Sequence, residues 1–142
     1  MPVQDAEHRL DDDQPSQQTI LVVENDAGVR RLLDMVLRSF YFNVIIATGS
    51  HEALEISTRR KIDLVLTDVQ MPGLDGPELF ALLKAINPNI VCCFMSGDTG
   101  KYTIQELFQR GAAGFINKPF SLDELRAMIL NAIEQPHGEE FF

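Results

Sequence analysis

The stretch KIDLVLTDVQMPGLDG, Lys61–Gly76, joins a short apolar run to a series of turn-forming residues. The run from Asp63 to Thr67 is rich in β-branched and aliphatic residues, and it is too short for a helix. Pro72-Gly73 and Asp75-Gly76 follow it closely, as turn residues do after a strand. Because the run shows little polar alternation, it predicts a strand buried on both faces, as in a parallel sheet.

Asp68 stands at the end of this predicted strand. Open α/β sheets bind their ligands in the crevice outside the carboxyl ends of the strands, so a carboxylate at this place is positioned for chemistry. The alternative, for this residue taken alone, is a loop aspartate that caps the next turn. The choice depends on what the rest of the chain places beside it.

Composition and charge narrow the class of protein. The chain has 142 residues, 45% of them hydrophobic and 23% charged, which suits one globular domain with its own core. The net charge is −9, and most of it falls in residues 1–18 and 135–142. No basic cluster is arranged for a phosphate backbone, so we expect no direct binding of DNA or RNA.

The sequence shows no sign of export or membrane insertion. No apolar run approaches the roughly 18 residues that a membrane span needs, and the polar, acidic N-terminus is no signal peptide. The only two cysteines, Cys92 and Cys93, are adjacent in an apolar run. They favour a buried strand in a reducing compartment over a disulfide or a metal site. We therefore expect a cytoplasmic protein.

Four further apolar runs predict strands, and a segment of helical periodicity follows each strand. The predicted strands are Thr19–Glu24, Asn43–Ala47, Ile90–Met95 and Phe115–Asn117. Strict strand–helix alternation predicts an α/β fold, a five-stranded, doubly wound parallel sheet of flavodoxin-like type with helices on both faces. The predicted organisation is a disordered acidic arm at 1–18, one folded domain at 19–134 and a C-terminal tail at 135–142.

Polar residues mark the expected helix starts. Asn25 or Asp26 can cap the first helix, and Ser121 and Glu124 have the spacing of a capping box. The segment Lys101–Arg110 has the least regular apolar face of the predicted helices. It is either part of a partner-binding face or a marginally stable surface helix.

Four predicted strands end in polar residues that can converge. These are Glu24, Asp68, Ser96 and Lys118, and in a doubly wound sheet such ends lie along one edge. Two acids beside a lysine and a hydroxyl suit a hard divalent cation and a phosphoryl group. Magnesium prefers oxygen ligands and keeps several waters, and lysine supplies a point charge for a phosphoryl oxygen.

Several motifs occur in an order that resembles a known family. They are ILVVEND at Ile20–Asp26, DLVLTDVQMPGLDG at Asp63–Gly76, MSGD at Met95–Asp98 and GAAGFINKPF at Gly111–Phe120. Together they resemble the receiver domain of bacterial two-component response regulators, over about Thr19–Ile133. Any one motif is weak evidence, but the set is highly specific.

The resemblance implies a phosphoacceptor and a metal pocket. Asp68 would attack the phosphorus of a phosphohistidine on a sensor histidine kinase or a histidine phosphotransfer protein. The metal, Mg²⁺ or Mn²⁺, would be held by Asp68, by Glu24 through water, by the backbone carbonyl of Gln70 and by the residue at position 25. The family usually has a second acid where Asn25 stands, so we expect weaker magnesium binding and slower phosphorylation.

The resemblance also implies a switch. Ser96 and Lys118 would bind phosphoryl oxygens, and Phe115 would swing inward as Ser96 moves. Gln70 and Asp98 flank the site at positions that influence phosphoryl lifetime, and the Lys118–Pro119 bond would be a cis peptide, which an X-Pro bond allows at small cost. The chain would then be a binding module controlled by phosphorylation, with an unidentified downstream protein partner and the option of a weak homodimer, and not a turnover enzyme.

Three alternatives remain open. Because of Asn25, the chain could be a pseudo-receiver that binds partners independently of phosphorylation. A phosphohydrolase resembling haloacid dehalogenases would need a second acid two residues after Asp68, where this chain has Gln70. A flavodoxin-like cofactor binder would need a phosphate-cradling loop after the first strand, where the acidic segment Glu24-Asn25-Asp26 would repel phosphate unless a metal ion intervened.

Overall fold

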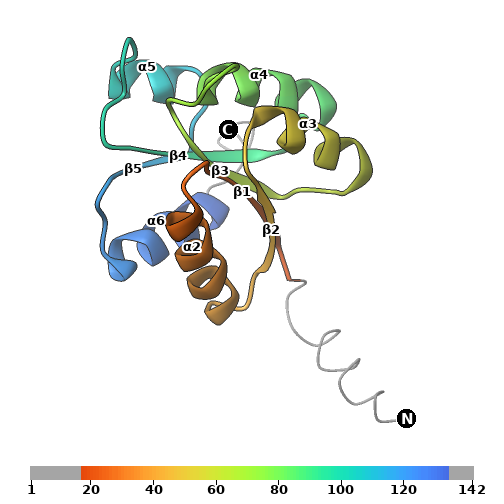
Figure 1. Ribbon diagram of the computed structural model, residues 1–142, viewed down its shortest axis with the longest axis vertical. Helices are drawn as coiled ribbons and strands as arrows, with labels where there is room; N and C mark the ends of the chain where they lie inside the picture. The colour runs from red at the N-terminus through yellow and green to blue at the C-terminus, as the bar shows by residue number, and fades with distance from the viewer. Residues whose placement is uncertain (1–16, 135–142) are drawn as a thin grey trace, which may run out of the picture.

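The computed structural model describes residues 17–134, and these form one parallel sheet with helices on both faces (Figure 1). The strands are β1 (Thr19–Val23), β2 (Asn43–Ala47), β3 (Leu64–Asp68), β4 (Val91–Ser96) and β5 (Gly114–Asn117). Their order in the sheet is β2-β1-β3-β4-β5, and every neighbouring pair is parallel. The predicted fold class is confirmed. The predicted arm at 1–18 and tail at 135–142 lie almost wholly outside the described residues.

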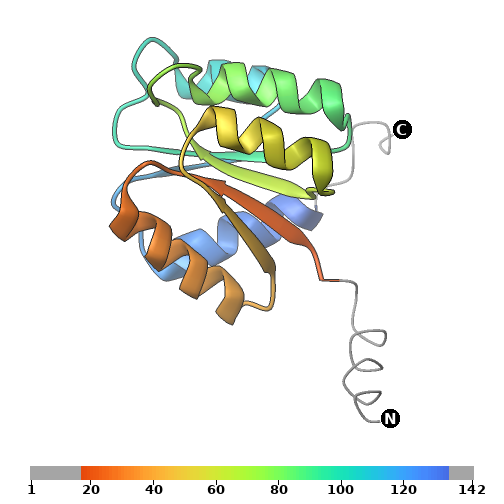
Figure 2. The same cartoon turned by 45° about the vertical axis from the view of Figure 1, so that its right-hand side comes forward.

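The helices connect the strands in strict alternation and divide between the two faces. They are α2 (Ala27–Ser39), α3 (Ser50–Arg59), α4 (Gly76–Ile86), α5 (Ile104–Gln109) and α6 (Leu122–Glu134). Helices α2 and α6 cover one face of the sheet, and α3, α4 and α5 cover the other (Figures 1 and 2). Within residues 17–134, no helix is both long enough and apolar enough to span a bilayer.

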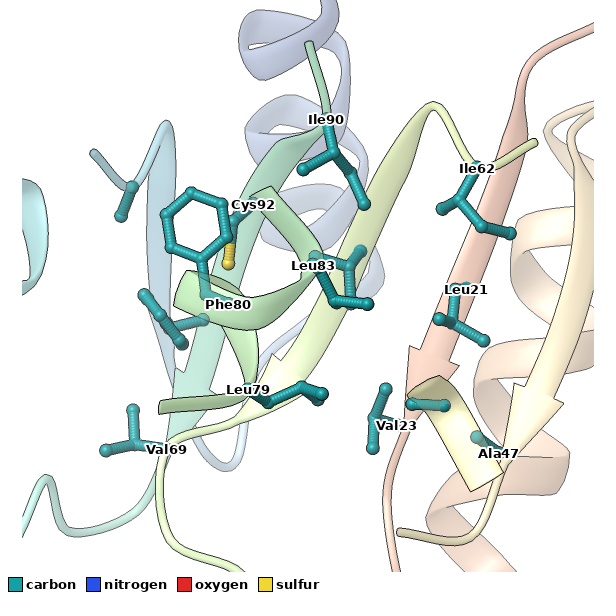
Figure 3. Packing of buried hydrophobic residues seen from close by; sticks show 14 of the residues in the cluster. Leu21, Val23, Ala47, Ile62, Val69, Leu79, Phe80, Leu83, Ile90 and Cys92 are labelled. Carbon is teal, nitrogen blue, oxygen red and sulfur yellow. The ribbon is translucent and has the colours of Figure 1, made fainter. Parts of the chain in front are cut away.

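Each face of the sheet carries its own apolar core because successive strand residues point to opposite sides. In β1, Leu21 and Val23 pack toward α3 and α4, whereas Ile20 and Val22 pack toward α2 and α6. Figure 3 shows part of the first core, including Leu79 and Leu83 of α4 above the strands. Strand β3 is buried along its whole length, as predicted for the stretch from Asp63 to Asp68.

Side-chain caps fix the points where the helices begin. Asp26, one of the two predicted candidates, caps α2 by accepting a hydrogen bond from the Val29 amide at 3.0 Å. The predicted capping box at the start of α6 is present, with the Ser121 and Glu124 side chains and amides bonded reciprocally at 2.9 and 3.0 Å. Similar boxes begin α4 at Asp75 and α5 at Thr103. The loops at this edge are thereby held close to the strand ends.

Candidate functional site

Asp68 lies at the carboxyl end of β3, the central strand of the sheet, and is only 6% exposed. The Lys118 ammonium, which follows β5, reaches across β4 and lies 2.7 Å from Oδ1 of Asp68. The same nitrogen lies 2.7 Å from Oε1 of Glu24, which follows β1. Three residues that are far apart in the sequence therefore meet in one polar cluster.

Glu24 is the most deeply buried member of this cluster, at 1% exposed. Its Oε2 accepts a hydrogen bond from the Asp26 amide at 3.0 Å, and its own amide donates to the Ala47 carbonyl at 3.2 Å. The Arg30 guanidinium donates to the Glu24 carbonyl at 2.9 Å. Both carboxylate oxygens are therefore satisfied, and the side chain is held against Lys118 rather than turned toward solvent.

The electrostatics of the cluster follow from two acids sharing one base. Burial, reinforced by the hydrogen bond and negative charge of Glu24, raises the pKa of Asp68 to about 7 against the opposing effect of Lys118. For Lys118, burial favours the neutral amine, but hydrogen bonds and charge from Asp68 and Glu24 outweigh it, and its pKa lies above the ordinary value. With both acids ionised the cluster carries one net negative charge, a state that an added cation stabilises.

Ser96 ends β4 beside Asp68 in the sheet and is 5% exposed, but its hydroxyl is turned to its own loop. The Ser96 Oγ donates to the Asp98 carbonyl at 2.6 Å and accepts from the Asp98 amide at 2.9 Å. The Gln70 side-chain amide donates to the same Asp98 carbonyl at 2.5 Å. The structure therefore brings Gln70, Ser96 and Asp98 into one hydrogen-bonded group at the edge of the cluster.

The remaining predicted site residues take three different positions. The Lys118–Pro119 peptide bond is cis, and the Lys118 amide donates to the Ser96 carbonyl at 3.0 Å. Phe115 of β5 is half-buried and packs against the core on the α3, α4 and α5 side. Asn25 follows Glu24 in the chain and is exposed.

Asp26, next to Asn25, belongs to the helix rather than to the cluster. Its hydrogen bond from the Val29 amide is the main reason that its pKa is lowered. Within residues 17–134, no set of three or more His, Cys, Asp or Glu side chains is placed to hold a metal ion. Glu24 and Asp68 bring two carboxylates to the Lys118 ammonium, a number that magnesium sites with several waters tolerate.

Sequence reasoning missed three parts of this region. Arg30, which anchors Glu24, gives no signal beyond a surface position on an amphipathic helix. The Tyr102 hydroxyl donates a hydrogen bond to Asp75 at 2.8 Å. This bond joins two loops, and the sequence alone does not indicate that they lie close together. Gly76 had a partial signal in its Asp-Gly turn, but its tight approach to the Asp68 backbone is a tertiary feature.

The family model of the response regulator receiver domain matches residues 20–130. The chain therefore belongs to the response regulator receiver family, the class that the sheet and its strand-end residues define.

Among curated proteins, the chain is 36% identical to sporulation initiation phosphotransferase F of Bacillus subtilis over 107 residues, 75% of this chain and 86% of that protein. It is 34% identical to the transcriptional regulatory protein ZraR of Escherichia coli over 119 residues, which cover 84% of this chain but 27% of that protein. The chain thus spans about a quarter of the length of the transcriptional regulators it matches.

Solved structures show the same architecture. A response regulator receiver domain protein from Clostridium thermocellum superposes with a TM-score of 0.75 at 28% identity, covering 82% of this chain and 94% of that one. The chemotaxis protein CheY4 of Vibrio cholerae gives the same TM-score at 22% identity, covering 82% of this chain and 99% of that one. At this identity the likeness shows a shared fold and nothing more.

Proposed function

We propose that the chain is a phosphorylation-controlled receiver module in which Asp68 accepts a phosphoryl group. The donor is a phosphohistidine on a sensor histidine kinase or on a histidine phosphotransfer protein. The observation that carries the proposal is the convergence of Asp68 and Glu24 on the Lys118 ammonium at 2.7 Å each. A buried carboxylate with a fixed cation beside it is the arrangement that phosphoryl transfer to an aspartate requires.

The proposed transfer needs an ionised Asp68. A carboxylate oxygen of Asp68 attacks the phosphorus, the phosphorus–nitrogen bond to the donor histidine breaks, and its electron pair returns to the imidazole. The Lys118 ammonium moves its contact from the Asp68 carboxylate to the phosphoryl group and neutralises charge on the phosphoryl oxygens. The protein need only position the reacting groups and stabilise the charge on the phosphoryl oxygens. We therefore propose that the chain supports its own phosphoryl transfer without being a turnover enzyme.

The donor atoms at this edge fit a magnesium ion. The residues that would hold it are Asp68, Glu24 through water, the backbone carbonyl of Gln70 and the Asn25 amide oxygen. They supply hard oxygen donors with few carboxylates, and the cluster carries a net negative charge. A bound divalent ion supplies charge neutralisation for the phosphoryl oxygens and favours the ionised form of Asp68.

Modification of Asp68 would change the surface through Ser96. A phosphoryl group adds nearly two negative charges, and contacts with Lys118 and with the Ser96 hydroxyl would then favour a rearranged loop. Phe115 lies in the adjoining β5 and would follow Ser96 inward. The responsive face would include α5, where Ile104 and Phe108 are 43% and 45% exposed, and it suits a downstream protein partner.

Phosphoryl lifetime would depend on the residues above the site. The Gln70 side chain donates to the Asp98 carbonyl, which ties the loop after β3 to the loop after β4. We propose that these two residues set the rate at which the phosphoryl group is lost.

Intact-mass measurement tests the proposal directly. The chain is incubated with acetyl phosphate, with and without magnesium, alongside Asp68→Asn. We expect a phosphoryl adduct that requires magnesium and is absent from the variant. An adduct that persists in Asp68→Asn would place the chemistry elsewhere and contradict the assignment.

The second candidate is a pseudo-receiver that binds partners without phosphorylation. The observation that favours it is Asn25, which supplies no charge where the family usually has an acid. It predicts no adduct at any magnesium concentration in the experiment above. If Asn25→Asp then restored the adduct, the defect would lie in the metal pocket alone.

A further inference from the structure

Tyr102 joins the loop after β4 to the loop after β3. Its hydroxyl donates to Oδ2 of Asp75 at 2.8 Å, while Oδ1 of Asp75 accepts from the Glu78 amide at 2.9 Å as the cap of α4. One carboxylate therefore serves both the helix start and the tyrosine. Because Asp75 is fixed by the cap, it offers Tyr102 a rigid anchor.

The Tyr102 ring is enclosed as well as hydrogen-bonded. The residue is 8% exposed and belongs to the core on the α3, α4 and α5 side. The Arg110 guanidinium lies 5.1 Å from the ring centre and the Lys101 ammonium 5.4 Å from it. Burial, together with the hydrogen bond and charge of Asp75, raises the pKa of Tyr102 to about 12, so the hydroxyl remains a donor across the working pH range.

A second contact ties the same two loops near the phosphoacceptor. The Gln70 side chain of the β3–α4 loop donates to the Asp98 carbonyl. The segment 97–103 is thus held at Asp98 by Gln70 and at Tyr102 by Asp75. Between Ser96 and Tyr102, the Thr99 hydroxyl donates to the Tyr102 carbonyl at 2.6 Å, which closes a compact turn.

This double attachment determines where the Ser96 hydroxyl points. Ser96 exchanges two hydrogen bonds with the Asp98 backbone, so it reaches a phosphoryl group on Asp68 only when it leaves Asp98. Any movement of the loop that accompanies this release strains the attachment at Tyr102, because Asp75 cannot follow without disturbing the start of α4.

We propose that Tyr102 is a positioning residue for phosphoryl transfer, whose hydrogen bond to Asp75 retains the loop in the arrangement that keeps Ser96 bonded to Asp98. The inference rests on the proposed function and adds a residue that controls it. Weakening the bond raises the fraction of chains in which Ser96 is free for the incoming group. The apparent rate of phosphorylation scales with that fraction.

Tyr102→Phe keeps the ring in the core and removes only the donor. We expect it to accept a phosphoryl group from acetyl phosphate about three- to tenfold faster than wild type, the factor that one lost hydrogen bond corresponds to. The control is Asn87→Ala at the opposite end of α4, which removes a hydrogen bond of 3.0 Å to the Ile62 carbonyl and one of 3.1 Å from the Asn89 amide. It lowers stability at least as much as Tyr102→Phe but leaves the rate unchanged.

Asp75→Ser tests the partner side of the same bond. Serine still caps α4 but is too short to reach the tyrosine hydroxyl. If the bond is the cause, Asp75→Ser raises the rate to a similar extent, and the double variant with Tyr102→Phe is no faster than either single variant. Independent, multiplying effects in the double variant would overturn the assignment.

A spectroscopic measurement separates positioning from packing. With Tyr41→Phe, Tyr102 is the only tyrosine, because the chain has two, and 3-fluorotyrosine then reports on it alone. Beryllofluoride, a phosphoryl mimic, should shift its fluorine resonance in the presence of magnesium, and should not do so in Asp68→Asn. An unshifted resonance on a chain that binds beryllofluoride would overturn the inference.

The outcomes also distinguish this inference from the proposed function. If wild type forms no adduct and binds no beryllofluoride, both are wrong. If wild type forms the adduct while Tyr102→Phe matches its rate, the receiver chemistry stands and the role of Tyr102 is overturned.

Discussion

Lys118 and the buried Glu24 form a partly buried ion pair of 2.7 Å across the carboxyl edge of the sheet. Ninety-four residues separate them, and their contact draws the end of β5 toward the end of β1 over the two strands that lie between. Because the same ammonium also contacts Asp68 at 2.7 Å, Glu24 competes with Asp68 for its counter-ion. This competition is one reason that Asp68 prefers a proton near neutral pH.

Ionisation of Asp68 should lower the free energy of unfolding of the chain. Burial is the chief reason that its pKa rises from the ordinary 3.8 to about 7 in the folded chain. The stabilisation linked to its proton is therefore complete below about pH 4 and is lost as pH rises to about 7. A rise of about three pKa units corresponds to about 4 kcal/mol, and solvent screening reduces this value. Without metal, Asp68→Asn should therefore be more stable than wild type by roughly 2 kcal/mol at pH 8, with the difference shrinking toward pH 4. Urea denaturation at several pH values measures it.

The control for this effect is magnesium itself. Added magnesium should stabilise wild type at pH 8 and leave Asp68→Asn almost unchanged, because only the ionised carboxylate binds it well. Stability curves that run parallel for the two proteins between pH 4 and 8 would show that Asp68 has an ordinary pKa in the folded chain.

Asn25→Asp should strengthen magnesium binding. The position follows Glu24 directly and is exposed, and a carboxylate there would add a full negative charge to those of Glu24 and Asp68 beside the ion. We expect the dissociation constant, measured by isothermal titration calorimetry, to fall about five- to tenfold, with a matching gain in phosphorylation rate at low magnesium.

Asp26→Asn is the matched control for net charge. An amide oxygen still caps α2, and the residue points at the Val29 amide rather than at the cluster. The dissociation constant for magnesium should change less than twofold. If Asp26→Asn weakened binding as much as Asn25→Asp strengthened it, the general field of the acidic edge, rather than a ligand at position 25, would govern affinity.

Local patterns were enough to predict the fold. Each strand is a short apolar run with turn residues after it, as at Asp63–Asp68, and strict alternation with helices leaves few topologies. The errors lie at the element ends. The helix predicted at Lys101–Arg110 begins only at Ile104, because Thr103 caps it and Tyr102 is drawn into the core by Asp75.

The convergence of strand ends was predictable from the sequence, but the contacts between the side chains were not. The strand ends identified Glu24, Asp68, Ser96 and Lys118 because parallel strands present their carboxyl ends at one edge. The sequence carries no information on which acid Lys118 contacts, and the structure has it contact both. Nor does the sequence reveal that Ser96 bonds Asp98, since this depends on the loop conformation.

Cys92 and Cys93 should be inert toward thiol reagents in the folded chain. Both are buried in β4, and burial raises the pKa of Cys93 from 9.0 to about 12 and raises that of Cys92 well above 9.0. At pH 8, Ellman's reagent should react only in denaturant. Because the pKa of each thiol is higher in the folded chain than in the unfolded chain, the protonated thiols stabilise the fold fully below about pH 9, and this stabilisation is lost as pH rises toward 12. Rapid labelling of the native chain would contradict this burial.

Gly76→Ala should displace Asp68, the proposed phosphoacceptor. A Cβ at this position would overlap the Asp68 carbonyl oxygen and lie 3.1 Å from its carbonyl carbon, and the backbone there is fixed because the Gly76 amide donates to the Val69 carbonyl at 2.7 Å. We expect a loss of about 3 kcal/mol in the free energy of unfolding and at least a roughly tenfold slower phosphorylation by acetyl phosphate.

Gly49→Ala separates this steric effect from the general cost of replacing a glycine at a helix start. Gly49 precedes α3 in extended backbone, and a Cβ there meets nothing within 4 Å. Because alanine is a poorer N-cap than glycine, the change should cost about 0.5–1 kcal/mol, well below the loss expected for Gly76→Ala, and should leave phosphorylation at the wild-type rate. If Gly76→Ala behaved like Gly49→Ala in both measurements, the end of β3 would be free to shift, and Asp68 would not depend on a rigid junction with α4.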